Sequence, residues 1–332
     1  MKIFYAVQAT GNGHISRAME LLPYLKKYGE VDIFLSGSNS TLPLDAPVAF
    51  RSRGLSLQYT CHGSLNYLKT LKQLNLTRIR KEARDLPLKK YDLVLNDFEA
   101  ITSLACKMKG VPSIHFGHQA SFITNKTPRP DKKDRMGEWI LKNYANGAYN
   151  IGLHFNRYDD FIEPPVIKSG IWMAEAVDKG YITVYLPSYC DKELITIFLS
   201  MKDVRFEIFS RQAKKIFQIE NITLLPVNET SFNKSLISCH GIITGAGFET
   251  PSEGLYLNKK LLVIPIKGQY EQLCNAAALK KMGIKVLDRI SSGFYKEVDQ
   301  WLLYPQPADV IQFKPTVEIV NRLIGMAQRY SN

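Results

Sequence analysis

Residues 241–275 read GIITGAGFETPSEGLYLNKKLLVIPIKGQYEQLCN, and this stretch decides the fold more than any other part of the chain. The apolar residues Ile242 and Ile243 predict a strand that ends in a turn with glycines at 245 and 247. A helix is expected to open at Thr250-Pro251, because proline suits the first helical turn. A second strand is expected over Leu261–Ile266. Strands separated by helices in this way predict a parallel sheet covered on both faces.

The glycine turn and the helix start also predict a binding site. Glycine lets a backbone approach a ligand closely, and the free N–H groups of a helix start favour anions. Glu253 is expected in the first turn of this helix, where a carboxylate can accept hydrogen bonds from sugar hydroxyls. The segment therefore predicts a site for a phosphorylated sugar compound.

Length and composition indicate a two-domain protein without a membrane span. The 332 residues suit two α/β domains of about 150 residues each. No apolar run reaches the roughly 18–20 residues that a spanning helix needs, and the apolar stretch at the N-terminus is too short for a signal peptide. The five cysteines include no C-x-x-C pair, so structural disulfides and a zinc site are not expected, which fits the cytoplasm.

The net charge of +12 is concentrated in part of the first half. Residues 65–90 combine leucines near helical spacing with basic residues, against only Glu82 and Asp85 as acidic ones. They predict either a surface helix whose leucines face the core, or a face that contacts anionic lipid. Nucleic acid is not an expected partner, because no recognised binding motif accompanies the charge. The basic residues are Lys69, Lys72, Arg78, Arg80, Lys81, Arg84, Lys89 and Lys90.

The same alternation of strands and helices runs through the rest of the chain. The fold class is therefore α/β, with two doubly wound domains facing each other across a cleft, and ligands are expected beyond the carboxyl ends of the strands. In the first half that edge carries Gly11–His14, Asp97-Phe98-Glu99 and His115–Gln119. Strands are expected at residues 2–8, 31–35, 92–95, 113–116, 181–186, 205–209, 222–225 and 285–287, and helices at 15–27, 100–109 and 315–330.

Gly11-Asn12-Gly13-His14 directly follows the first expected strand. A dinucleotide fingerprint would need a third glycine where Ser16 stands and an acidic residue after the second strand, so an NAD site is not expected. A neutral imidazole at the start of a helix can instead take a proton from an attacking hydroxyl. His14 is therefore the candidate general base, with Asp97 as the group that orients it or binds acceptor hydroxyls.

These motifs resemble those of the GT-B glycosyltransferases. The chain is similar to the MurG-like lipid-linked N-acetylglucosaminyltransferases and to the plant UDP-glycosyltransferases. It more closely resembles a prokaryotic group of predicted glycosyltransferases that open with G-x-G-H-x-x-R, here residues 11–17. The resemblance implies an acceptor-binding domain at 1–160 and a nucleotide-sugar domain at 161–315, both Rossmann-like. It also implies a C-terminal helix at 316–332 that packs back on the first domain.

The resemblance implies a role for individual residues on the donor side. Glu253 matches the ribose-binding glutamate, and Glu271 and Gln272 match the pair that reads the donor sugar. Val227 stands where backbone groups contact the nucleobase. The phosphate loop is Gly245, Ala246, Gly247, Phe248 and Thr250, and the further donor candidates are Gly13, Ser188 and Asn275. The acceptor candidates are Asn12, Glu99, His118 and Gln119.

The implied reaction is a single displacement with inversion that requires no metal and no cofactor. A nucleotide-diphosphate sugar, with UDP favoured, is the co-substrate, and the acceptor is a glycan, a lipid-linked compound or another component of the cell envelope. One departure concerns Gly245, where the plant enzymes have His and the MurG-like enzymes Arg. The diphosphate charge must then be met by backbone N–H groups, the helix dipole, or a cation such as Arg211 or Lys267.

Two alternatives share these features. A UDP-N-acetylglucosamine 2-epimerase has the same two-domain fold and donor site, but usually more carboxylates around the sugar than Asp97, Glu99 and Glu271. A non-catalytic sugar-nucleotide binder or membrane-associated scaffold is the alternative from another class. The basic, leucine-rich residues 65–90 favour a location of the enzyme at the inner face of the plasma membrane.

Overall fold

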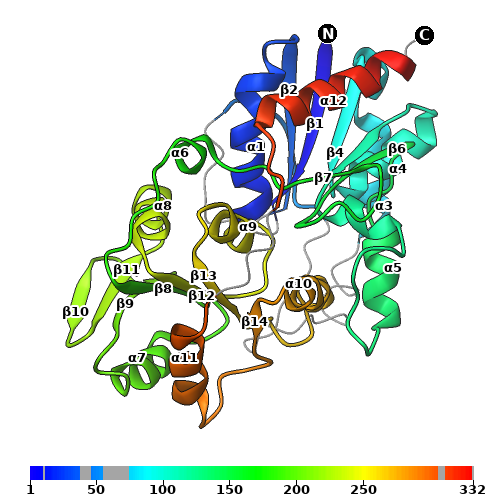
Figure 1. The fold of residues 1–332 in the computed structure, drawn as a ribbon. Helices are drawn as coiled ribbons and strands as arrows, with labels where there is room; N and C mark the ends of the chain where they lie inside the picture. The colour runs from blue at the N-terminus through cyan, green and yellow to red at the C-terminus, as the bar shows by residue number, and fades with distance from the viewer. Residues whose placement is uncertain (10–11, 38–45, 55–74, 306–310, 331–332) are drawn as a thin grey trace.

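Seven parallel strands form the sheet of the first domain, in the order β3-β2-β1-β4-β5-β6-β7 (Figure 1). The computed structural model describes residues 1–9, 12–37, 46–54, 75–305 and 311–330. The strands are β1 (Lys2–Gln8), β2 (Glu30–Ser36), β3 (Val48–Ser52), β4 (Leu93–Asp97), β5 (Ile114–Gly117), β6 (Tyr149–Leu153) and β7 (Ile162–Glu163). The helices are α1 (Asn12–Leu25), α3 (Leu76–Asp85), α4 (Ala100–Lys109), α5 (Arg135–Asn143) and the 3-10 turns η1 (Leu88–Lys90) and η2 (Gln119–Ile123).

The second domain repeats this plan with a second seven-stranded sheet, in the order β10-β11-β9-β8-β12-β13-β14. All neighbours in it are parallel except β10 and β11. The strands are β8 (Tyr181–Tyr185), β9 (Arg205–Ser210), β10 (Phe217–Ile219), β11 (Ile222–Pro226), β12 (Gly241–Thr244), β13 (Lys260–Val263) and β14 (Lys285–Val286). The helices are α6 (Ser169–Trp172), α7 (Asp191–Leu199), α8 (Glu229–Ser238), α9 (Glu249–Tyr256), α10 (Tyr270–Lys281), α11 (Phe294–Leu303) and α12 (Thr316–Tyr330).

The predicted α/β fold class is confirmed, and several elements differ from the predicted ones only at their ends. Strand β13 ends at Val263, short of the predicted Ile266, because Pro265 has no N–H to continue the ladder. Helix α9 begins at Glu249, so Glu253 lies in its second turn rather than its first. Strands β3, β6, β7 and β10 were not predicted.

The described part of the basic stretch 65–90, residues 75–90, contains helix α3 and the turn η1. Residues 65–74 lie outside the described part of the chain. Helix α3 begins at Leu76, where the Asn75 side chain accepts a hydrogen bond from the N–H of Arg78, and it ends before Pro87. Ile79 and Ala83 are buried, but Leu76 is 61% exposed, so this leucine does not face the core.

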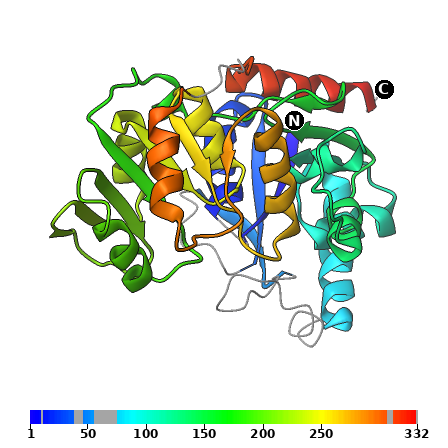
Figure 2. The same cartoon turned by 60° about the horizontal axis from the view of Figure 1, so that its bottom comes forward.

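The C-terminal helix α12 lies along the first domain next to α1, and both Figure 1 and Figure 2 show it near the N-terminus. Its contacts are specific: the Tyr28 hydroxyl bonds to Asn321 at 2.5 Å, and Arg322 pairs with the buried Glu163. Lys314 also bonds to Glu163, at 2.7 Å. Glu163 belongs to β7, so the first sheet continues past residue 160, where the expected domain boundary lies.

In both sheets the order of the strands changes direction beside the first strand of the domain, because the later strands are added on the other side of that strand. The reversal falls between β1 and β4 in the first sheet and between β8 and β12 in the second. In open α/β sheets, ligands bind beyond the carboxyl ends of the strands at such switch points. The segments that follow these four strands carry His14 in the first turn of α1, and Phe98, Ser188 and Gly245 in loops, so both switch points contribute predicted site residues.

Candidate active site

His14 and Asp97 form a hydrogen-bonded pair at the switch point of the first sheet. His14 belongs to the first turn of α1 and Asp97 ends β4, and His14 Nδ1 lies 2.8 Å from Asp97 Oδ1. Asp97 is fully buried, whereas the His14 side chain is 11% exposed. A carboxylate can only accept, so a hydrogen bond to Asp97 requires the proton on Nδ1, and in the neutral imidazole Nε2 then has the lone pair. His14 is thus arranged as a base that Asp97 orients.

Arg17 holds the same carboxylate from the next turn of α1. Its Nε donates to Asp97 Oδ2 at 3.1 Å and its Nη2 to Oδ1 at 2.7 Å. Burial by itself would raise the pKa of Asp97, but the charges and hydrogen bonds of Arg17 and His14 lower it to about 2. Asp97 is therefore an anion at neutral pH.

Glu249 brings the second domain into this cluster. It is the first residue of α9, and its Oε1 accepts a hydrogen bond from Arg17 Nη1. A Cβ atom on Gly13 would lie 3.0 Å from Glu249 Cγ. Glycine at this position therefore leaves space for the Glu249 side chain to lie against the start of α1. Burial raises the pKa of Glu249 to about 7, although the charge of Arg17 lowers it.

Two further hydrogen bonds cross between the domains beside this cluster. Gln119 Nε2 donates to Glu271 Oε2 at 3.1 Å and lies 3.5 Å from His14 Nε2. His118 Nε2 lies 2.7 Å from Asn275 Oδ1, and its ring stacks on Phe248 with centroids 3.9 Å apart. Burial lowers the pKa of His118. The structure therefore joins predicted acceptor residues directly to predicted donor residues.

The predicted phosphate loop lies between β12 and α9; of the two predicted amides, Asn275 bonds to this loop and Gln272 to the segment after β13. Gln272 Oε1 accepts from the N–H of Ile266 at 2.9 Å, and Asn275 Nδ2 donates to the Ala246 carbonyl at 3.0 Å. A Cβ on Gly247 would meet no atom within 4 Å, which leaves open space beside this backbone. Thr250 is the second residue of α9.

The remaining predicted donor residues lie around the second sheet. Glu253 is 3% exposed and pairs with Lys168 Nζ at 2.9 Å, so a ribose would have to compete with this ion pair. The N–H of Val227 donates to Ser210 O at 3.2 Å. Ser188 follows β8 and is half-buried. Arg211 is exposed and its Nε lies 3.4 Å from the Tyr185 hydroxyl.

The contacts of Glu99 do not fit the predicted acceptor role. Its side chain is fully buried and caps α4 by accepting from the N–H groups of Ile101 and Thr102. Oε1 also accepts from the Ser36 hydroxyl at 2.8 Å. Both carboxylate oxygens are thus used inside the domain, and Glu99 is a structural residue. Asn12 begins α1, while Gly11 of the predicted motif lies outside the described residues.

Three residues of the cluster received no role from the sequence. Arg17 follows His14 by three residues, so its place on the same helix face was a usable signal. Glu249 meets Arg17 across 232 residues of sequence, which no local pattern reveals. Phe98 has φ +56°, a rare conformation for a bulky residue, and its ring lies parallel to that of His14 at 6.4 Å.

Neither metal binding nor membrane spanning finds support in the described part of the chain. Within residues 1–9, 12–37, 46–54, 75–305 and 311–330, no group of three or more His, Cys, Asp or Glu side chains is arranged to hold a metal ion. Among the helices of these same ranges, none is both long and apolar enough to cross a bilayer.

Two facing α/β domains, each with its switch point at the shared interface, define the GT-B class of glycosyltransferases, as predicted. The chain belongs to the family described as Glycosyl transferase family 1, whose model matches residues 1–298. It is thus a glycosyltransferase enzyme. Among curated proteins, none matches the sequence.

Solved structures of glycosyltransferases share the fold over nearly the whole chain. The spinosyn forosaminyltransferase SpnP is 14% identical, with a TM-score of 0.61 and 99% of each chain covered. Arabidopsis thaliana UGT89C1 in complex with UDP is 11% identical, with a TM-score of 0.62 and 99% of each chain covered. Acinetobacter baumannii MurG is 16% identical, with a TM-score of 0.59, 98% of this chain and 99% of MurG covered. At these identities the likeness shows the fold alone.

Proposed function

We propose that this glycosyltransferase moves a hexose or N-acetylhexosamine from a nucleotide-diphosphate sugar, with UDP favoured, to a hydroxyl group, and that it inverts the anomeric centre. The acceptor is a glycan, a lipid-linked compound or another component of the cell envelope. The observation that carries the proposal is the His14–Asp97 pair at 2.8 Å, placed beside the start of α9 by the Arg17–Glu249 contact. The solved complexes of UGT89C1 with UDP and of VinC with dTDP support a nucleoside diphosphate as the leaving group.

In the proposed reaction His14 Nε2 takes the proton of the acceptor hydroxyl. The hydroxyl oxygen attacks the anomeric carbon, and the bond from that carbon to the diphosphate oxygen breaks with its electron pair on the oxygen. Asp97 holds Nδ1–H and stabilises the imidazolium that forms. The backbone N–H groups of the Gly245–Thr250 loop and the start of α9 stabilise the diphosphate, with Arg211 or Lys267 as additional cations.

Donor choice is tested by thermal unfolding with a panel of nucleotide sugars, because a ligand that binds the folded state raises the transition temperature. We expect UDP-sugars to give the largest shift. The product of the reaction with that donor is then examined by proton NMR, and an inverted anomeric configuration is expected. A product with retained configuration would rule out the single displacement.

A reaction mixture without acceptor separates this proposal from the two alternatives. A 2-epimerase converts the sugar nucleotide in that mixture, whereas a transferase releases at most free sugar by slow hydrolysis. A non-catalytic binder gives a thermal shift with one donor but no transfer to any acceptor tested. Transfer that depends on acceptor and donor together supports the proposal.

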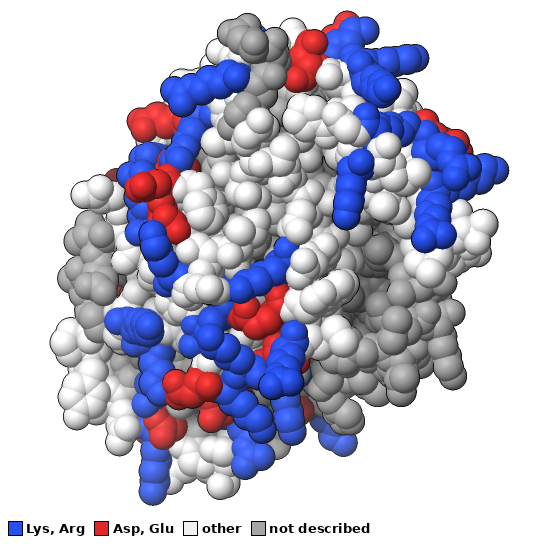
Figure 3. Space-filling view, turned by 90° about the vertical axis from the view of Figure 1, so that its right-hand side faces the viewer, with Lys and Arg blue, Asp and Glu red and all other residues white. Residues whose placement is uncertain are grey.

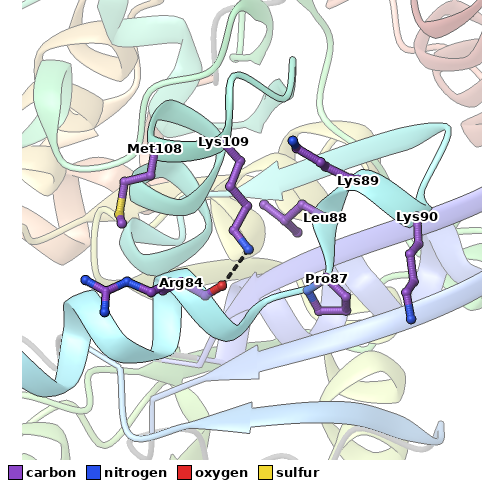
Figure 4. Close-up of a pocket in the computed structure, with 7 residues that line it drawn as sticks. All are labelled: Arg84, Pro87, Leu88, Lys89, Lys90, Met108 and Lys109. Carbon is purple, nitrogen blue, oxygen red and sulfur yellow. Dashed lines mark hydrogen bonds between the residues drawn. The ribbon is translucent and has the colours of Figure 1, made fainter.

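We further propose that the enzyme works in the cytoplasm, at the inner face of the plasma membrane, through the basic face that includes residues 75–90. Figure 3, a view of the side that lies on the right in Figure 1, shows Lys and Arg in several groups with Asp and Glu among them. A surface hollow of about 470 Å³ between α3, η1 and α4 has an exposed Met108 beside four cations (Figure 4). The cations are Arg84, Lys89, Lys90 and Lys109.

The directions of these side chains favour a lipid surface over one small anion. Figure 4 shows Arg84, Lys89 and Lys90 pointing in different directions, while Lys109 Nζ donates to the Arg84 carbonyl at 2.6 Å. Sedimentation with vesicles of phosphatidylcholine, with and without phosphatidylglycerol, tests this surface. The Lys89→Glu/Lys90→Glu variant should lose about tenfold or more in binding to the anionic vesicles. Lys192→Glu/Lys202→Glu, an equal charge change on the second domain, should bind as the wild type does.

A further inference from the structure

Arg17 is a buried cation that the proposed reaction does not use. It is 3% exposed and lies between two carboxylates, Asp97 of its own domain and Glu249 of the other. Its Nη2 is also 3.0 Å from His14 Nδ1. An arginine in this place links the candidate base to the partner domain through direct contacts.

The partner carboxylate lies on the helix that follows the predicted phosphate loop. Glu249 opens α9, and Gly13 at the start of α1 approaches it closely. Any shift of α9 away from α1 therefore separates Glu249 from Arg17. The contact can form only when the two domains are as close as they are in this structure.

The charges of the cluster surround the imidazole on which the transfer step places a proton. The guanidinium of Arg17 lies between two carboxyl groups, those of Asp97 and Glu249. In a buried site such charges interact more strongly than in water. Without Glu249, the guanidinium beside Nδ1 would oppose the imidazolium that the transfer step creates.

We propose that Arg17 and Glu249 are positioning residues that couple contact between the two domains to the orientation of the His14–Asp97 pair. Arg17 fixes the Asp97 carboxylate by two hydrogen bonds, and Glu249 fixes Arg17. The proton then moves efficiently only when the donor domain is in place. This inference rests on the proposed function, because it assumes that His14 accepts the acceptor proton.

Kinetics of Glu249→Gln test the coupling. We expect kcat to fall about tenfold to a hundredfold while the dissociation constant for UDP changes little, and Glu249→Asp to recover part of the loss. The Arg17→Gln/Glu249→Gln double variant should be no slower than Arg17→Gln alone, because the two residues act as one unit. Glu297→Gln, which removes an exposed carboxylate paired with Lys285 on the same domain, should behave as the wild type does.

The pH dependence provides a readout that a merely structural role would not produce. The groups that face Glu249 are Arg17 and His14 of α1, Asp97 of β4, Glu253 of α9, and Lys168. Because the pKa of Glu249 is raised to about 7, its charge is present above that pH and lost below it. The ratio of the wild-type to the Glu249→Gln kcat should therefore be larger at pH 8 than at pH 6.

Three results would overturn the inference: a wild-type kcat in Glu249→Gln, fully additive effects in the double variant, or a kcat ratio that is equal at pH 6 and pH 8. Thermal unfolding of each variant checks that it folds. If Arg17→Gln does not fold, the kinetics of Glu249→Gln alone provide the test. Small-angle X-ray scattering adds a readout without catalysis. With UDP bound, Glu249→Gln should have a larger radius of gyration than the wild type, even if His14 were not the base.

Discussion

Asp97 is the residue on which the candidate active site depends, because it is shared by the base and by a buried cation. Its oxygens receive hydrogen bonds from His14 Nδ1 and from two nitrogen atoms of Arg17. A carboxylate with a pKa lowered to about 2 stabilises the folded state when it is ionised. That contribution is present above the unfolded-state pKa of about 4 and is lost as the pH falls through the folded-state value.

We therefore predict that Asp97→Asn lowers the free energy of unfolding at pH 7 by about 3 kcal/mol, because the buried Arg17 loses one of its two carboxylate partners. Between about pH 4 and pH 2 the wild type should lose stability more steeply than the variant does. Urea unfolding at a series of pH values measures both effects. Asp299→Asn, which alters an exposed carboxylate, should follow the wild-type curve; a parallel loss in both variants would contradict the role of Asp97.

At this scale the sequence predicted the His14–Asp97 pair but not the residues that contact it. The turn after the first strand predicted His14, and the end of a later strand predicted Asp97. Glu249 was not recognised, because its role depends on a contact with Arg17 that only the folded chain creates. The acceptor role predicted for Glu99 stays a prediction, and its contacts fit capping instead, since a carboxylate directly before a helix is as well suited to capping as to binding.

At the scale of an element, the residue that caps helix α4 lies where a ligand-binding residue was predicted. Glu99 accepts hydrogen bonds from the N–H groups of Ile101 and Thr102 and from Ser36, and burial raises its pKa although these bonds lower it. The cap lies directly after the strand that ends in Asp97. It therefore holds the start of α4 without touching the base.

We predict that Glu99→Ala costs about 1–3 kcal/mol of unfolding free energy, because buried backbone donors lose their acceptor. Chemical denaturation measures this cost, and kcat should stay close to the wild-type value. Asn228→Ala, which removes a cap from the more exposed start of α8, is the matched control and should cost about 1 kcal/mol. A large loss of acceptor affinity in a stably folded Glu99→Ala variant would restore the binding role.

Elements with strong apolar runs and clear ends were predictable, and short ones were not. The ranges predicted for β1 and α4 agree with the structure, because each has a continuous pattern and a glycine or polar end. Strand β7 has two residues, too few to show any alternation, whereas β14, also of two residues, lies within the predicted strand 285–287. The edge strand β10 is antiparallel and largely exposed, so it lacks the apolar run of the buried strands.

The whole molecule depends on how closely the two domains meet. A small apolar cluster joins them, formed by Phe122 and Leu141 of the first domain and Tyr270 and Cys274 of the second. Beside it the Tyr270 hydroxyl donates to Glu138 Oε1 at 2.7 Å. The sequence predicted two domains with a shared site but not these partners, since contacts between α5 and α10 leave no repeating pattern in either helix.

Gly137 tests this closeness, because a Cβ there would lie 2.5 Å from Tyr270 Cβ and Cγ. We predict that Gly137→Ala pushes α5 and α10 apart and lowers the free energy of unfolding by about 1–3 kcal/mol. It should also lower kcat by about tenfold or more. Steady-state kinetics and small-angle scattering check the prediction. Gly293→Ala, where a Cβ would meet nothing within 4 Å, should leave both unchanged; an active and equally compact Gly137→Ala enzyme would contradict it.

The turnover of His14→Ala, measured together with donor binding, tests the central claim most directly. A general base contributes about 10²–10⁴ to a rate, so we predict a loss of that size in kcat. The dissociation constant for the donor should stay nearly unchanged, and His240→Ala should remain fully active. A His14→Ala enzyme that keeps its kcat, or that loses donor binding as strongly as turnover, would contradict the assignment of His14 as the base.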